Sequence, residues 1–175
     1  GVEGSVIPDG HAVFFQAPLG FTTNYRNLNN LFNGRGYFVG YGPDTDFIPD
    51  WIDSPPKFRF RLLEFRPPAE ANQVFEDGAQ ERRDGEPQQF DGWYKQQVAG
   101  VLNSGSFSDH LHPLASNILT LVVSPRDSAE QSTGGRVDTY SAIAPGYEFD
   151  SNDQSSQVDS YSQQVPPLVR LTMVA

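Results

Sequence analysis

Residues 58–68 read FRFRLLEFRPP, the clearest β-strand pattern in the chain and the stretch that decides the fold. Successive side chains of a strand point to opposite faces. One face therefore carries Phe58, Phe60 and Leu62, and the other carries Lys57, Arg59 and Arg61. The pattern predicts an amphipathic strand whose phenylalanines face the core and whose arginines face away from it.

The alternation does not continue unchanged along the strand. After Leu62 the apolar positions move by one residue, to Leu63 and Phe65. Such a shift predicts a β-bulge, or a change of the buried side, at this point. Pro67-Pro68 then removes two backbone donors, so strand pairing is expected to stop there.

The role of the arginines is constrained by the charge of the whole chain. The net charge is −10 and the isoelectric point about 4.5, whereas nucleic-acid binders usually carry a strongly basic face. Single-strand binding would also require aromatic side chains on the face of Arg59 and Arg61, and the aromatic residues lie on the other face. Arg66 lies beyond the shift. These three arginines are expected to be solvated or to contact a neighbouring protein subunit.

The remaining periodic segments predict a mixed architecture. Strands are expected over residues 11–20, 36–42, 117–126 and 165–175, and short helices over 24–34, capped by Asn24, and 91–105, capped by Asp91. In the first strand Val13, Phe15 and Ala17 share one apolar face. Residues 69–90 and 127–164 are polar and are expected to be long loops. The prediction is a single α+β domain, residues 1–175, with an antiparallel sheet and one or two short helices.

The candidates for a metal or catalytic site lie in one short segment, residues 108–112, which contains a pair of histidines. His110 and His112 would share a face on a strand, beside Asp109, but His11 is the only other histidine and Pro113 favours a loop. Ser108 with Asp109 and His110 supplies triad residue types, but sequence neighbours diverge and no nucleophile elbow is present. The absence of cysteine excludes thiol catalysis and iron–sulfur clusters. No catalytic residue is predicted.

Two further patterns contain residue types found in ligand sites. Gly34 and Gly36 follow a predicted helix and precede a strand, the reverse of the order that a phosphate-binding loop requires. The acidic stretch 148–159 contains Asp150, Asn152, Asp153 and Asp159, oxygen ligands of the kind that Ca²⁺ prefers, but it lacks the spacing of an EF-hand. No cofactor-binding residue and no metal ligand is predicted.

Several segments together resemble a known family. They are AVFFQAPLG, GYFVGYG, FRFRLLEFRPPAE, the Trp93 region, PLASNILTLVVSPR, AIAPGYEFDS and QVPPLVRLTMVA. In this order they resemble the prepilin-like Verru_Chthon cassette protein C family of Verrucomicrobia, which is similar to the J-type minor pseudopilins of type II secretion. The resemblance extends from about residue 12 to the end of the chain.

The resemblance implies a pilin-like globular domain without catalytic residues. The precursor would have a leader, a peptidase site and a long apolar N-terminal helix that anchors it in the inner membrane. The domain itself would lie in the cell envelope, on the periplasmic or extracellular face, and contact other pilin-like or pseudopilin-like subunits. The chain has no initiator methionine and no such helix, so it is expected to be a processed or trimmed piece.

Three functions remain open from the sequence. The first is a non-enzymatic assembly subunit of a type IV pilus-like or type II secretion-like apparatus. The second is an extracellular β-rich module that binds a carbohydrate or a protein through aromatic residues such as Tyr41, Trp51 and Trp93. The third is a metal-dependent hydrolase that uses Asp109, His110 and His112.

Overall fold

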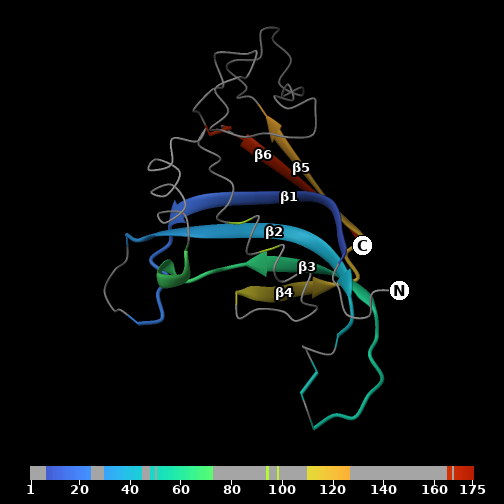
Figure 1. Cartoon of the computed structure of the whole chain (residues 1–175). Coiled ribbons are helices and arrows are strands. Elements are labelled where there is room, and N and C mark those ends of the chain that lie inside the picture. Colours follow the sequence, from blue (N-terminus) through green and yellow to red (C-terminus); the bar gives the residue numbers. More distant parts are fainter. Residues whose placement is uncertain are drawn as a thin grey trace, which may run out of the picture. The chain divides into compact units, whose positions relative to one another are not determined.

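Strand β3 (Arg59–Phe65) lies inside a four-stranded antiparallel sheet in the order β1-β2-β3-β4. The other strands of this sheet are β1 (Ile7–Pro18), β2 (Phe32–Gly42) and β4 (Leu111–Ser116). Strands β5 (Thr120–Arg126) and β6 (Leu168–Val174) form a second, two-stranded sheet, and a short 3₁₀ turn, η2 (Ala69–Ala71), follows β3. Sequence neighbours are thus spatial neighbours, as in a β-meander (Figure 1).

These elements belong to a computed structural model. It describes residues 7–24, 30–44, 48–49, 51–72, 94, 98, 110–126, 165–166 and 168–175. By contacts the chain divides into two compact units, Gly1–Leu121 with Met173–Ala175, and Val122–Thr172. The prediction of one domain over residues 1–175 stays a prediction.

The predicted α+β class is wrong. The described residues form strands in two antiparallel sheets and contain no helix of seven or more residues, so the pilin-like fold with its helix is not shown. The predicted helix 24–34 fails at its C-terminal end, because Phe32, Asn33 and Gly34 belong to β2. Of the predicted helix 91–105, Tyr94 and Val98 are described and have helical backbone, and the other residues lie outside the described ranges.

The buried face of β3 is the face of the arginines, which corrects the predicted orientation. Arg61, Leu63 and Phe65 are buried in alternation, with Leu63 fully inaccessible. Phe58, which was expected to face the core, is 52% exposed. The buried side is therefore the same along β3, and its buried residues change from arginine to apolar side chains after position 61.

A register shift between Leu62 and Leu63 in the β3–β4 pairing confirms the predicted irregularity. Leu62 pairs with Ala115 and Leu63 with Pro113, so the extra residue is Leu114 on β4. Strand β4 itself was predicted as a loop because of Pro113. Proline is tolerated at the edge of a sheet, where its missing N–H need not join a ladder, and β4 is the edge strand.

Strand β1 also carries a bulge. Its register to β2 shifts between Asp9 and Ala12, and Gly10 has φ of +76°, a conformation that glycine adopts without a side-chain clash. Beyond the bulge Phe14 packs against the core, whereas Phe15 is exposed. The face that Val13, Phe15 and Ala17 share is thus the outer face of the sheet, which their apolar character alone does not indicate.

The core lies on one side of the meander. It consists of Phe38, Leu63, Phe65, Val98 and Leu111, with Phe14 and Tyr94 packed against it. The ring of Phe14 stacks on Tyr94 with 4.2 Å between the centroids, and its own strand position is opposite Gly36. Tyr94 and Val98, the two described residues of the predicted helix 91–105, both contact this core.

Candidate functional site

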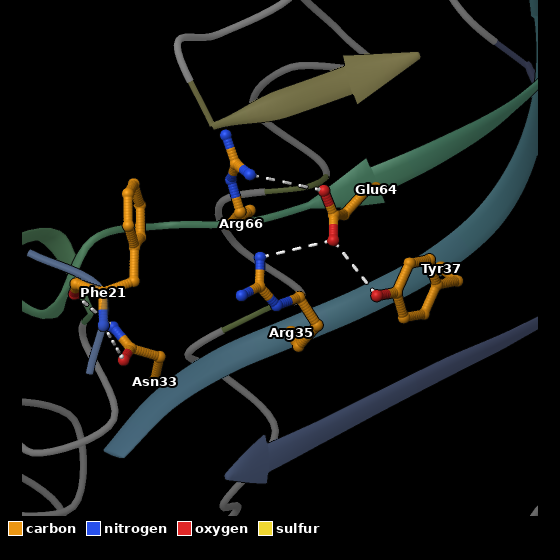
Figure 2. Close-up of polar contacts among 6 residues, drawn as sticks. All are labelled: Phe21, Asn33, Arg35, Tyr37, Glu64 and Arg66. Atoms are coloured by element: carbon orange, nitrogen blue, oxygen red, sulfur yellow. Dashed lines mark hydrogen bonds and ion pairs between the residues drawn. The ribbon is translucent and has the colours of Figure 1, made fainter. Parts of the chain in front are cut away.

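Glu64 lies at the centre of a polar cluster on the outer face of the sheet, opposite Tyr37 and His112 in the strand register. Its carboxylate accepts hydrogen bonds from Tyr37 Oη at 3.1 Å and from Arg35 Nη1 at 3.3 Å (Figure 2). Arg66 Nη1 lies 4.0 Å from the second carboxylate oxygen. Two arginines and a tyrosine therefore occupy the carboxylate, and the cluster ties β2 to β3.

The same cluster continues to the segment after β1. The guanidinium of Arg66 lies over the ring of Phe21, 5.0 Å from its centroid, a cation–π contact. Asn33 donates to the Phe21 carbonyl and accepts from the Phe21 amide, at 2.7 and 2.9 Å. Figure 2 shows these contacts beside the Glu64 cluster. Arg66, expected to be free for a partner, is thus part of the packing of this chain.

Burial shifts the proton equilibria of two groups in this cluster. Desolvation, and then the hydrogen bond to Glu64, raise the pKa of Tyr37. Desolvation, and then the positive charge of Arg66, lower the pKa of His112. Both hydrogen bonds reach the same carboxylate oxygen of Glu64, and the ion pair with Arg35 keeps the carboxylate in contact with a positive charge.

Replacing Tyr37 by phenylalanine is expected to lower the free energy of unfolding by about 1 kcal/mol. The variant loses the hydrogen bond to Glu64, while Arg35 continues to neutralise the carboxylate. Urea denaturation at neutral pH measures the change. A variant as stable as the parent protein would mean that water replaces the tyrosine hydroxyl without loss.

A second carboxylate, Glu70 of η2, binds the segment that follows β1. It accepts hydrogen bonds from the Thr22 hydroxyl and from the backbone amides of Thr23 and Asn24, the latter at 2.9 Å. Asn24, predicted to cap a helix, therefore donates its own amide to a side chain distant in sequence. The hydrogen bonds, first of all that from Thr22, lower the pKa of Glu70 to about 2.

The lowered pKa of Glu70 predicts an acid-dependent contribution to stability. Because the folded protein binds the proton less tightly than the unfolded chain, the contribution is complete above pH 4.5 and is lost as the pH falls towards 2. In Glu70→Gln the decline in stability over this interval is expected to be shallower than in the parent protein. Urea denaturation at pH 5, 4 and 3 tests this, and parallel pH profiles would contradict it.

Arg61 of β3 is buried and has a structural role. It is 4% exposed, and its register partner is Gly40, which leaves room for the guanidinium to cross β2. Nη1 donates to the carbonyls of Gly42 and Pro43, at 3.0 and 3.1 Å. Nη2 lies 4.0 Å from the carboxylate of Asp44. Arg61 thus fixes the end of β2 and the start of the following loop.

Asp44 completes this arrangement, which we name the Arg61–Asp44 clasp. Its Oδ1 accepts the backbone N–H of Lys57 at 2.7 Å, and its Oδ2 lies 3.9 Å from Nε of Arg59. Burial lowers the pKa of Arg61, and the charge of Asp44 opposes that shift. The clasp therefore joins the two ends of the twelve-residue segment 45–56, which we name the Trp51 loop.

The described part of the Trp51 loop exposes apolar side chains. The amide of Ile52 donates to the carbonyl of Pro49 at 2.9 Å, which closes a turn that contains Trp51. Trp51 is 83% exposed, and Ile52 is also exposed. The chain leaves the loop through Phe58, whose ring lies 6.0 Å from that of Tyr41, and Tyr41 also contacts Phe60 at 4.7 Å.

The structure describes only two of the residues that the sequence grouped as catalytic, His110 and His112. His112 lies in β4 and His110 just before it, while Ser108 and Asp109 lie outside the described residues. In the part of the chain that the structure describes, no group of three or more His, Cys, Asp or Glu side chains could hold a metal ion. Trp93 and the acidic stretch 148–159 also lie outside the described residues.

Sequence reasoning missed both the Arg61–Asp44 clasp and the Trp51 loop that it closes. Glycines 40 and 42 opposite the arginines were the one available indication that their side chains could lie inward.

No family model matches the chain, and searches of curated proteins and of solved structures returned no match either.

The predicted localisation requires a correction. The resemblance implied a cell-envelope protein with an anchoring helix in the inner membrane. Among the described residues, no helix is long and apolar enough to cross a membrane. The anchor is therefore not shown, and the predicted localisation is withdrawn.

Proposed function

We propose that this chain is a non-enzymatic assembly subunit that acts by binding other protein subunits. The observation that carries the proposal is a contrast between polar side chains that are engaged within the chain and large apolar side chains that are exposed. Three of the described carboxylates are engaged within the chain: Glu64 with Arg35 and Tyr37, Asp44 with Arg61, and Glu70 with Thr22. Large apolar side chains, in contrast, are exposed at Trp51 and along β6.

Strand β6 supports the proposal independently of the loop. All its residues are exposed, and five of them are large and apolar, namely Leu168, Val169, Leu171, Met173 and Val174. A strand that is apolar on both faces is unusual on a solvated surface and is typical of a contact with another chain. The apparatus that the sequence resemblance favours is type IV pilus-like or type II secretion-like, with other pilin-like or pseudopilin-like subunits as partners.

The proposal is tested by the size and composition of the native particle. The tagged full-length protein, isolated from its native cells after mild cross-linking, is expected in a complex well above the 19.4 kDa of the chain. The same partner proteins should recur between preparations. A protein that migrates as a monomer both with and without cross-linking would overturn the proposal.

A carbohydrate-binding module is the second candidate, favoured by the exposed indole of Trp51. Sugars stack on exposed aromatic rings, and an indole in a turn is accessible on its flat face. Titration with neutral oligosaccharides should then quench the fluorescence of the protein, with little quenching in Trp51→Ala. Unchanged fluorescence across a panel of neutral hexasaccharides would remove this candidate.

A further inference from the structure

The Trp51 loop combines a fixed neck with an exposed apolar turn. The neck is held by two sets of contacts. The Lys57 amide donates a hydrogen bond to Asp44, and the buried Arg61 contacts the Pro43 carbonyl and the Asp44 carboxylate. A twelve-residue segment with its ends joined has the length and closure of an Ω-loop, a type of loop that frequently has a function. A closed neck limits the positions that the turn can sample and so reduces the entropy lost on binding.

The exposed residue at the turn is of the type that dominates protein interfaces. Tryptophan is enriched among the few residues that supply most of the binding energy, and it acts by filling a pocket on the partner. Trp51 has few contacts within its own chain, being 83% exposed. The Trp51 side chain therefore contributes little to the stability of the fold, and its indole is available to a partner.

The charge of the loop defines the complementary surface. Residues 45–56, TDFIPDWIDSPP, contain three aspartates, Asp46, Asp50 and Asp53, and no lysine or arginine. The whole chain carries −10. A symmetric contact between the loops of two copies would bring like charges together, and like-charge contacts oppose association. An anionic membrane surface is disfavoured for the same reason.

We infer that the Trp51 loop docks into an apolar pocket, rimmed by lysine or arginine, on a different protein. The indole of Trp51 fills the pocket, and Asp53, which is exposed, faces the basic rim. The inference rests on the proposed function and names the part of the surface that contacts a partner. It assigns Arg61 and Asp44 the role of positioning residues, since they hold the loop and do not themselves reach its exposed turn.

The test begins with the full-length protein carrying the photo-cross-linker p-benzoylphenylalanine at position 51, with position 165 as the control. Val165 is 81% exposed and lies outside the loop. The protein captured at position 51 is then purified, and its dissociation constant is measured for the parent chain, Trp51→Ala, Asp53→Lys and the control Val165→Ala. Melting temperatures of the variants show that all four chains are folded.

The expected result is binding that weakens about 30-fold in Trp51→Ala, weakens less in Asp53→Lys, and does not change in Val165→Ala. The affinity should also fall as salt rises from 50 to 500 mM, because the rim contact is electrostatic. If the captured partner binds Trp51→Ala as tightly as the parent, the loop inference is overturned while the assembly proposal stands.

Three other outcomes also overturn the inference. A cross-link from position 51 to a second copy, with a dimer in sedimentation, would assign the loop to self-association. Saturable binding of cellohexaose that requires Trp51 would assign it to carbohydrate. Binding to neutral phosphatidylcholine vesicles that requires Trp51 would assign it to a lipid surface. If no partner binds and the native protein is also monomeric, the loop inference and the proposed function fail together.

Discussion

Replacing Arg61 by alanine is expected to lower the free energy of unfolding by about 3 kcal/mol. The variant leaves the carbonyls of Gly42 and Pro43 without their donor and leaves Asp44, which is 8% exposed, without its buried counter-ion. Each buried polar group that loses its partner costs about 1–3 kcal/mol, so the loss is a large part of the stability of a domain. Urea denaturation followed by circular dichroism measures it.

Arg59→Ala is the matched control for this prediction. Arg59 lies on the same face of the same strand and contacts the same carboxylate at 3.9 Å, but 40% of its side chain is exposed. An exposed ion pair contributes at most about 1 kcal/mol, so Arg59→Ala should be close to the parent. Equal losses in the two variants would show that burial of Arg61 is not what stabilises the clasp.

Gly36→Ala is expected to lower the free energy of unfolding by about 2 kcal/mol. A Cβ atom at position 36 would overlap Cδ1 and Cε1 of Phe14 and lie 3.3 Å from its Cγ. The ring cannot retreat without loss, because it stacks on Tyr94 and contacts Phe38 and Phe65, both at 6.2 Å between centroids. Thermal and urea denaturation measure the loss.

A double-mutant cycle isolates this contact. Phe14→Leu removes the ring and creates its own loss, and Gly36→Ala should then cost clearly less than it costs in the parent protein. Independent, additive losses would mean that the alanine is accommodated by movement of β1 as a whole, and that Phe14 does not restrict position 36.

Strand β3 and its limits were predictable from local pattern, whereas the strand order and β4 were not. The strand at 58–66, the irregularity at Leu62-Leu63 and the end at Pro67-Pro68 follow from alternation and from the missing proline donors. Which face is buried was not predictable. The carbonyls that make Arg61 tolerable in the interior come from Gly42 and Pro43, and nothing in the strand itself indicates them.

The errors elsewhere have the same origin. Leu28, Leu31 and Phe32 have helical spacing in the sequence, yet Phe32–Gly34 extend β2, where Asn33 is buried and hydrogen-bonded to the backbone of Phe21. Strand β4 contains Pro113, which local rules place in a loop, but its edge position removes the need for that donor. In both places a contact distant in sequence outweighs the local preference.

The candidate site was predictable in part. The sequence named Tyr41, Trp51 and Trp93 as aromatic residues that a binding module would use. Trp51 is 83% exposed, Tyr41 is half-buried, and Trp93 lies outside the described residues. The presentation of Trp51 was not predictable, since the closure of the Trp51 loop depends on Asp44 accepting the amide of Lys57 while Arg61 holds the strand end.

The most direct test of the clasp is amide hydrogen exchange at Lys57, measured by NMR in the parent protein and in Arg61→Ala. Lys57 is an exposed loop residue outside the strands, so its amide would exchange freely unless Asp44 holds it. The structure predicts exchange slowed by about 100-fold or more in the parent, with the protection lost in Arg61→Ala before that of the Leu63 amide in the sheet. Exchange of the Lys57 amide in the parent at the rate of an unstructured peptide would contradict the clasp and the closed loop that depends on it.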